Sequence, residues 1–281
     1  MSWKGTLDDA QMDDFRRDGL LVLRGFYDID ADIAPIQEGI RRIIGQVMLR
    51  HGIVDSQEDS SAPFDQQFLK MIALDRSLGG EVYDAVKQIP AFIRLLGKPG
   101  HEQLFHLLRP GSLPGVAAGG YGIRIDIPGE DRYRAEWHQE YPAQLRSLDG
   151  LVFWSPLVKM TADLGPVHFC PGSHIAGLQP VTTLGAGDGQ TGAYALRLRN
   201  EAHLLGQYPQ IAPLLAPGDL VAVDFLTLHA SGYNTSDHVR WSLQFRYFNF
   251  SDPTGMRHGW KGSFAAGVDF RSIHPELCAD S

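Results

Sequence analysis

Cysteine is scarce in this chain. Only Cys170 and Cys278 occur among 281 residues, and more than a hundred positions separate them. Small domains that depend on disulfide bonds carry many more cysteines, whereas scarce cysteine is common where thiols stay reduced. We therefore expect a cytoplasmic protein without a disulfide framework.

The sequence also lacks long apolar runs and a surplus of basic residues. No stretch approaches the ~20 apolar residues that a membrane-spanning helix needs, and no apolar run follows the first basic residue, so we expect no signal peptide. Lys and Arg number 25 against 33 Asp and Glu, a formal net charge of -8. This charge is unfavourable for binding a phosphate backbone. We expect a small-molecule partner rather than nucleic acid or membrane, and the oligomeric state stays open.

Internal repeats and low-complexity tracts are absent as well, and a chain of this length can bury one large core. Residues 1–110 show mainly helical spacing, as in Ile33, Ile36, Ile40 and Ile44. From 111 to 250, short β-branched and aromatic runs alternate with Gly and Pro turns, which favours a sandwich or barrel. We expect a single domain over 1–281, with residues 251–281 as a C-terminal tail and the Gly-rich residues 183–195 as a loop. The candidate strands are residues 20–26, 121–128, 135–142, 148–158, 166–173, 218–225 and 239–250.

Three residues suggest a metal site. His138 and Glu140 lie two apart in the predicted strand 135–142, so their side chains should point to one side while Gln139 points away. A carboxylate in an apolar β setting needs a partner, and a metal would supply one. His229 could add a third ligand from a distant strand. Two histidines and one carboxylate are the usual ligands of non-haem Fe(II) oxygenases. Taken singly, each of these residues is more often structural, and it is their combination that indicates a metal site.

A possible carboxylate-binding group follows. Arg240 lies 11 residues after His229, and we expect the two on neighbouring strands of a hairpin-like unit. Arg240 shares a strand face with Ser242, and a guanidinium beside a hydroxyl suits bidentate capture of a carboxylate. Arg124 alternates with Asp126 on an earlier strand. It could contact a co-substrate or form an exposed ion pair.

Four segments together resemble one known family. DDFRRDGLLVLRGF, WHQE, LGPVHFCPGSH and GDLVAVDFLTLHASGYNTSDHVRWSLQFRY are similar to the motifs of the phytanoyl-CoA dioxygenase-like family of Fe(II)- and 2-oxoglutarate-dependent oxygenases. The last two segments are the specific ones, because H-x-E alone is common.

The resemblance implies a mostly β protein with a double-stranded β-helix (jelly-roll) core and N-terminal α-helices. It implies that His138, Glu140 and His229 bind Fe(II). Arg240 would hold 2-oxoglutarate with help from Ser242. Ser155 lies where the family often places a co-substrate contact. O2 would be the remaining co-substrate.

Two positions depart from the family pattern. Glu140 stands where the family more often has Asp, and Leu164 stands where it usually has Asn. Related halogenases replace the carboxylate with a small residue, so the presence of Glu140 disfavours halogenation.

The expected function is oxidation of a small organic molecule, most simply hydroxylation with release of succinate and CO2. Three alternatives stay open. The same site could perform desaturation, epoxidation or cyclisation. The chain could be a non-catalytic jelly-roll metal-binding module. It could also be a cupin-type isomerase or lyase, which would not need Arg240.

Overall fold

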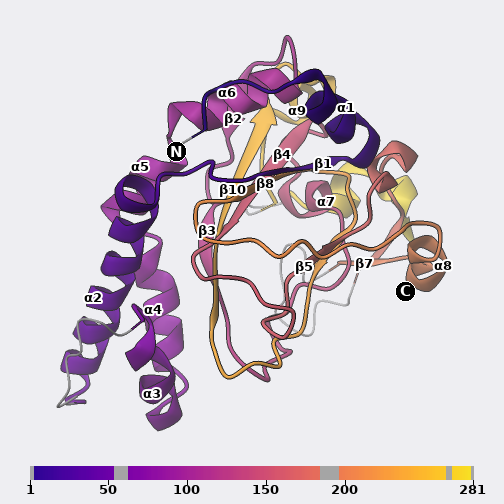
Figure 1. Cartoon of the computed structure of the whole chain (residues 1–281). Helices are drawn as coiled ribbons and strands as arrows, with labels where there is room; N and C mark the ends of the chain where they lie inside the picture. Colours follow the sequence, from indigo (N-terminus) through magenta and orange to yellow (C-terminus); the bar gives the residue numbers. More distant parts are fainter. Residues whose placement is uncertain (1–2, 54–62, 184–195, 264–267, 280–281) are drawn as a thin grey trace.

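Helices dominate the first part of the chain. The computed structural model describes all residues except 1–2, 54–62, 184–195, 264–267 and 280–281. The helices up to residue 108 are α1 (Asp9–Asp18), the π-helix η1 (Ile29–Ile33), α2 (Ala34–Arg50), α3 (Gln66–Leu74), α4 (Leu78–Val86), α5 (Pro90–Leu96) and α6 (Pro99–Leu108). Figure 1 shows α2 to α5 gathered into a lobe beside the strands. This agrees with the helical spacing of the sequence, which β1 (Leu20–Leu23) alone interrupts among the described residues before 110.

The largest sheet in the described part of the chain has six strands. Its order is β1-β8-β4-β10-β2, and β3 pairs with β10 on the edge opposite β4, the same edge that β2 occupies further along. All of its pairings are antiparallel. Besides β1, its strands are β2 (Pro114–Val116), β3 (Gly122–Asp126), β4 (Gly150–Pro156), β8 (Leu220–Asp224) and β10 (Arg240–Asn249).

The two faces of this sheet pack against different layers. Successive side chains of a strand point to opposite faces. Phe153 and Phe245 therefore face the helical lobe and join its core cluster. Val152 and Trp154 face the other way, into a second apolar cluster. Because both faces are covered, β4 is buried along its whole length, which explains why its sequence is apolar apart from Ser155.

Two smaller sheets lie on the side away from the helical lobe. One pairs β5 (Val167–Phe169) with β9 (His229–Ser231). The other joins β6 (Val181–Thr183), β7 (Leu196–Leu198) and the C-terminal β11 (Cys278–Ala279). The remaining helices are α7 (Glu140–Gln144), η2 (Ser173–Ala176), α8 (Glu201–Leu205), α9 (Pro253–His258), α10 (Phe270–Ile273) and η4 (Pro275–Leu277). The C-terminal tail thus returns to the core, where β11 pairs with β6.

Two expectations about local structure were wrong. Residues 135–142 do not form a strand, because the chain leaves its bridge at His138 and enters α7 at Glu140. His229 and Arg240 do not share a hairpin, since β9 pairs with β5 while β10 belongs to the six-stranded sheet. The predicted loop falls, from residue 184 on, outside the described residues. No described helix is long and apolar enough to cross a membrane.

Candidate metal centre

The two predicted histidine ligands lie directly opposite each other. His138 and His229 form an isolated antiparallel bridge. The His138 N–H donates to the His229 carbonyl at 3.0 Å, and the His229 N–H donates back at 3.1 Å. Their ring centroids are 4.2 Å apart. Backbone pairing therefore brings together two imidazoles that are 91 residues apart in the sequence.

Each imidazole is held in one orientation by a backbone carbonyl. Nδ1 of His138 lies 2.7 Å from the Glu136 oxygen, and Nδ1 of His229 lies 2.9 Å from the Thr227 oxygen. A carbonyl can only accept, so each Nδ1 carries a proton and each Nε2 is left as the atom that can bind a metal. Metal-binding histidines are commonly fixed in this way.

Glu140 supplies the carboxylate from the first residue of α7. Its side chain is 2% exposed, and its Oε2 lies 3.6 Å from Nε2 of His229 and 3.9 Å from Nε2 of His138. One ligand atom from each of the three residues lies within 4.8 Å of the others. Gln139 points away as expected, with its amide bonded to the carbonyls of Gly177 and Leu226. Two imidazole nitrogens and one carboxylate oxygen in this arrangement fit a divalent iron ion.

The charge states of the cluster suit metal binding. Burial opposes ionisation of Glu140, but Arg246 and the two imidazoles hold the pKa of its carboxyl well below the usual value. Burial, with help from neighbouring His229, lowers the pKa of His138 to about 3. At neutral pH the cluster therefore contains a carboxylate and a neutral His138, both ready to bind a cation.

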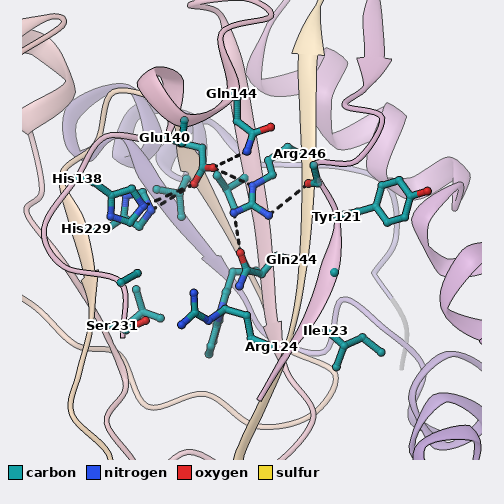
Figure 2. Close-up of a pocket in the computed structure, with 18 of the residues that line it drawn as sticks. Tyr121, Ile123, Arg124, His138, Glu140, Gln144, His229, Ser231, Gln244 and Arg246 are labelled. Atoms are coloured by element: carbon teal, nitrogen blue, oxygen red, sulfur yellow. Dashed lines mark hydrogen bonds and ion pairs between the residues drawn. The ribbon is translucent and has the colours of Figure 1, made fainter. Parts of the chain in front are cut away.

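The cluster opens into a cavity of about 320 Å³ between the six-stranded sheet and the β5–β9 sheet. Figure 2 shows the three ligands on one wall, with Arg246, Gln244 and Arg124 along another. Further lining residues include Trp154, Phe169, Tyr121 and Tyr83, the last of which comes from α4 in the helical lobe. This volume is at the low end for small-molecule sites.

Of the residues predicted to bind the co-substrate, only Arg124 lines this cavity. Arg240 is 1% exposed and lies behind the wall, where its Nη2 is 2.9 Å from Oδ2 of Asp126 and its Nη1 donates to the Gly165 carbonyl. Arg124 binds the same carboxylate, with Nη2 2.9 Å from Oδ1 of Asp126. The Arg124–Asp126 pair is largely buried rather than exposed.

The two predicted serines differ in their placement. Ser155 follows the cavity-lining Trp154 and pairs with Leu243, so it faces the helical lobe instead of the cavity. Ser242 shares the face of β10 that carries Gln244 and Arg246. Within the described structure its buried Oγ has no hydrogen-bond partner.

Sequence reasoning missed several cavity residues, among them Gln144 at the end of α7 and three polar residues on β9 and β10. Ser231 lies two residues after His229 on β9, so the argument from alternating faces could have found it. Gln244 and Arg246 continue the face of β10 that begins with Arg240 and Ser242. Alternation along the strand therefore placed Gln244 and Arg246 on the same face as Arg240, but no sequence motif marked them as site residues.

The described chain is a mixed α/β protein with antiparallel sheets, not the mostly β protein expected from the sequence, because helices make up most of its first 110 residues. Its deeply placed 2-His-1-carboxylate cluster defines a mononuclear iron-type site. The model of the phytanoyl-CoA dioxygenase (PhyH) family matches residues 15–242, and the chain belongs to this family. The predicted family is thereby confirmed, and with it the enzyme class, an iron- and 2-oxoglutarate-dependent oxygenase.

Solved structures share the fold at low sequence identity. The epimerase SnoN from nogalamycin biosynthesis, solved with Fe3+, alpha ketoglutarate and nogalamycin RO, is 19% identical. The superposition covers 93% of this chain and 91% of the SnoN chain, with a TM-score of 0.57. The carbocyclase SnoK from the same biosynthesis is 15% identical. The superposition covers 96% of this chain and 98% of the SnoK chain, with a TM-score of 0.56. EctD from S. alaskensis, solved with 2-oxoglutarate and 5-hydroxyectoine, is 17% identical. The superposition covers 88% of this chain and 77% of the EctD chain, with a TM-score of 0.56. Among curated proteins, none matches the sequence significantly.

Proposed function

We propose that this protein hydroxylates a small organic molecule in a reaction that depends on Fe(II), 2-oxoglutarate and O2. The observation that carries the proposal is the convergence of His138, Glu140 and His229 within 4.8 Å at the wall of a cavity. We also propose that the antiparallel sheets form a double-stranded β-helix core over residues 111–250. The helical part, 1–110, and the tail, 251–281, would complete one domain.

The chain's own residues have defined tasks in this reaction. His138 and His229 would bind the iron through Nε2, and Glu140 would bind it through a carboxylate oxygen. The bound iron, with 2-oxoglutarate and O2, supplies the oxidising chemistry and releases succinate and CO2. The protein orients the reactants and limits water around them, as apolar Val152, Val223 and other lining side chains do here.

We propose that Arg240 and Ser242 hold the distal carboxylate of 2-oxoglutarate. Two observations support this placement. Arg240 is already bound to a carboxylate, that of Asp126, with its Nε at 3.1 Å and Nη2 at 2.9 Å from Oδ2. The Ser242 hydroxyl, fully buried and without a partner in the described structure, would gain one from a bound carboxylate. Arg124 is the competing candidate, because it lines the cavity.

The substrate should be small and should carry an acceptor oxygen. The cavity of about 320 Å³ would hold the co-substrate and the reacting part of the substrate, which favours a small substrate. Gln244 accepts a 2.7 Å hydrogen bond from Arg246 through Oε1. Its Nε2 is therefore the group turned to the cavity, where it can donate to a hydroxyl, carbonyl or carboxylate oxygen.

Desaturation, epoxidation and cyclisation remain alternatives for the same site, because the outcome depends on where the substrate lies relative to the metal. A metal-binding module without turnover is the alternative from another class. The fold itself accommodates different outcomes, since SnoN is an epimerase and SnoK a carbocyclase.

The test is a screen of small oxygen-bearing molecules with Fe(II) and 2-oxoglutarate, scored by stimulated succinate formation. A true substrate should raise succinate in proportion to product, and product formed under ¹⁸O2 should gain one labelled oxygen. A product without the label would replace hydroxylation by desaturation or cyclisation. Succinate formation that persists in His138→Ala would refute the proposed site.

A further inference from the structure

We propose that Arg246 and Gln144 are positioning residues that restrict Glu140 to binding the metal through one oxygen. Arg246 lies six residues beyond Arg240, and Gln144 lies at the end of α7. The inference rests on the proposed function, because it concerns how the iron stays accessible to 2-oxoglutarate and O2.

The two oxygens of Glu140 have different surroundings. Oε1 accepts from Nε of Arg246 at 2.9 Å and from Nε2 of Gln144 at 3.1 Å. Oε2 is the oxygen that faces the imidazoles, 3.6 Å from His229 and 3.9 Å from His138. Figure 2 shows this division, with Arg246 and Gln144 on one side of the carboxylate and the histidines on the other. Two donors on Oε1 leave Oε2 as the ligand atom.

The donors are themselves held in place. Nη1 of Arg146 donates to Oε1 of Gln144 at 3.2 Å, and a guanidinium can only donate. The amide nitrogen of Gln144 must therefore face Glu140. Arg246 is anchored through its other nitrogens, which donate to Oε1 of Gln244 at 2.7 Å and to the Gly120 carbonyl at 3.3 Å. All of these side chains are mostly buried, so water competes little for the bonds.

This restriction matters because carboxylates bind metals through one oxygen or through both. A 2-His-1-carboxylate site works by leaving open positions for co-substrates. A second Glu140 oxygen on the metal would occupy a position that 2-oxoglutarate or O2 requires. Glutamate is longer and more flexible than the aspartate usual in the family, so it has more freedom to turn its second oxygen inward. Arg246 and Gln144 remove that freedom.

The experiment measures two affinities of the full-length protein, using Co(II) as an air-stable probe metal. Co(II) is titrated into the metal-free protein, and 2-oxoglutarate is then titrated into the Co(II)-loaded protein. For Arg246→Met we expect Co(II) affinity to stay within about 10-fold of wild type, while 2-oxoglutarate affinity falls at least about 10-fold, an effect typical of losing a side chain that supports a ligand. The Co(II) absorption spectrum should already differ before 2-oxoglutarate is added, because the metal has gained an oxygen ligand.

Three further variants sharpen the result. Arg246→Lys keeps a donor and should recover part of the 2-oxoglutarate affinity. Gln144→Leu removes the weaker donor and should give a smaller loss, which keeps the test available if Arg246→Met does not fold. Arg134→Met is the matched control, because among the described residues Arg134 meets the cavity lining at the Ser231 carbonyl and otherwise pairs with exposed Asp131. It removes the same charge and should change neither affinity.

Unchanged 2-oxoglutarate affinity in both Arg246→Met and Gln144→Leu would overturn the proposal. So would parallel losses of Co(II) affinity and thermal stability with 2-oxoglutarate binding intact, since that pattern describes a merely structural arginine. Failure of the wild-type protein to bind 2-oxoglutarate with metal would instead refute the proposed function itself.

Discussion

Replacing Arg240 tests which arginine binds the co-substrate. The family motif favours Arg240, whereas Arg124 is the one that lines the cavity. Both bind Asp126, whose pKa is held below its usual value by these two guanidinium groups against the effect of burial. Arg240→Met and Arg124→Met each remove one guanidinium from this shared carboxylate, so the pair is matched in charge and in partner.

The magnitude follows from the bonds that Arg240 can make. A hydrogen bond to a charged group contributes about 1.5–3 kcal/mol, which corresponds to roughly a 10- to 150-fold change in affinity. We therefore expect Arg240→Met to raise the KM for 2-oxoglutarate by about that factor with little change in kcat, because the lost interaction is the same in the ground and transition states. The KM of Arg240→Lys should lie between those of wild type and Arg240→Met, since lysine keeps the charge but loses the two-pronged guanidinium geometry.

The assay is initial-rate 2-oxoglutarate decarboxylation over a range of co-substrate concentrations, with thermal unfolding measured in parallel. Arg240→Met should also lose about 3 kcal/mol of stability, near the low end for breaking a buried ion pair, because Arg124 still binds Asp126. Rates are therefore compared well below the melting temperature. A raised KM in Arg124→Met together with a normal KM in Arg240→Met would refute the assignment.

Two other predictions concern stability, each measured by urea unfolding. Burial lowers the pKa of His101 to about 3, and the Tyr27 hydroxyl lies 2.6 Å from its Nε2. Folding therefore favours the neutral ring, whereas the unfolded chain takes up a proton below pH ~6.5. The free energy of unfolding should accordingly fall by about 2 kcal/mol between pH 8 and pH 5. His101→Gln should lessen the difference in stability between pH 8 and pH 5 by that amount, and an unchanged difference would contradict this origin. Gly165→Ala should cost at least about 2 kcal/mol, because φ is +70° and an added Cβ would lie 2.6 Å from the Gly232 carbonyl oxygen. Gly45→Ala, in α2 with open space around it, should instead stabilise by about 0.5–1 kcal/mol, and equal effects of the two substitutions would contradict the account.

The ligands could be predicted from sequence because their chemistry is distinctive, but the backbone that carries them could not. His138 and Glu140 were expected on one strand face. Glu140 instead reaches the metal site from the start of α7, where the Phe225 carbonyl accepts from the backbone N–H groups of both Glu140 and Tyr141. That carbonyl lies 85 residues beyond Glu140 in the chain, so no local pattern in AEWHQEYP reports it. Tertiary contacts decided the conformation against the local strand pattern.

The pairing of strands could not be predicted from sequence either, because it too depends on tertiary contacts. A short polar segment between two apolar runs predicts a hairpin, yet the chain crosses from the β5–β9 sheet to the six-stranded sheet between His229 and Arg240. What the sequence did indicate was alternation along β10. That alternation places Gln244 and Arg246 on the cavity face and Phe245 against the helical lobe, although only the structure shows Arg246 bound to Glu140.

The most direct test of the metal centre is anaerobic Fe(II) titration followed by 2-oxoglutarate decarboxylation in air, comparing wild type, His229→Ala and His168→Ala. His168 lies in β5, opposite the residue that follows His229, and is not part of the ligand cluster. Wild type and His168→Ala should bind one Fe(II) and turn over 2-oxoglutarate, whereas His229→Ala should lose both. Equal iron binding and turnover in all three proteins would contradict the central claim.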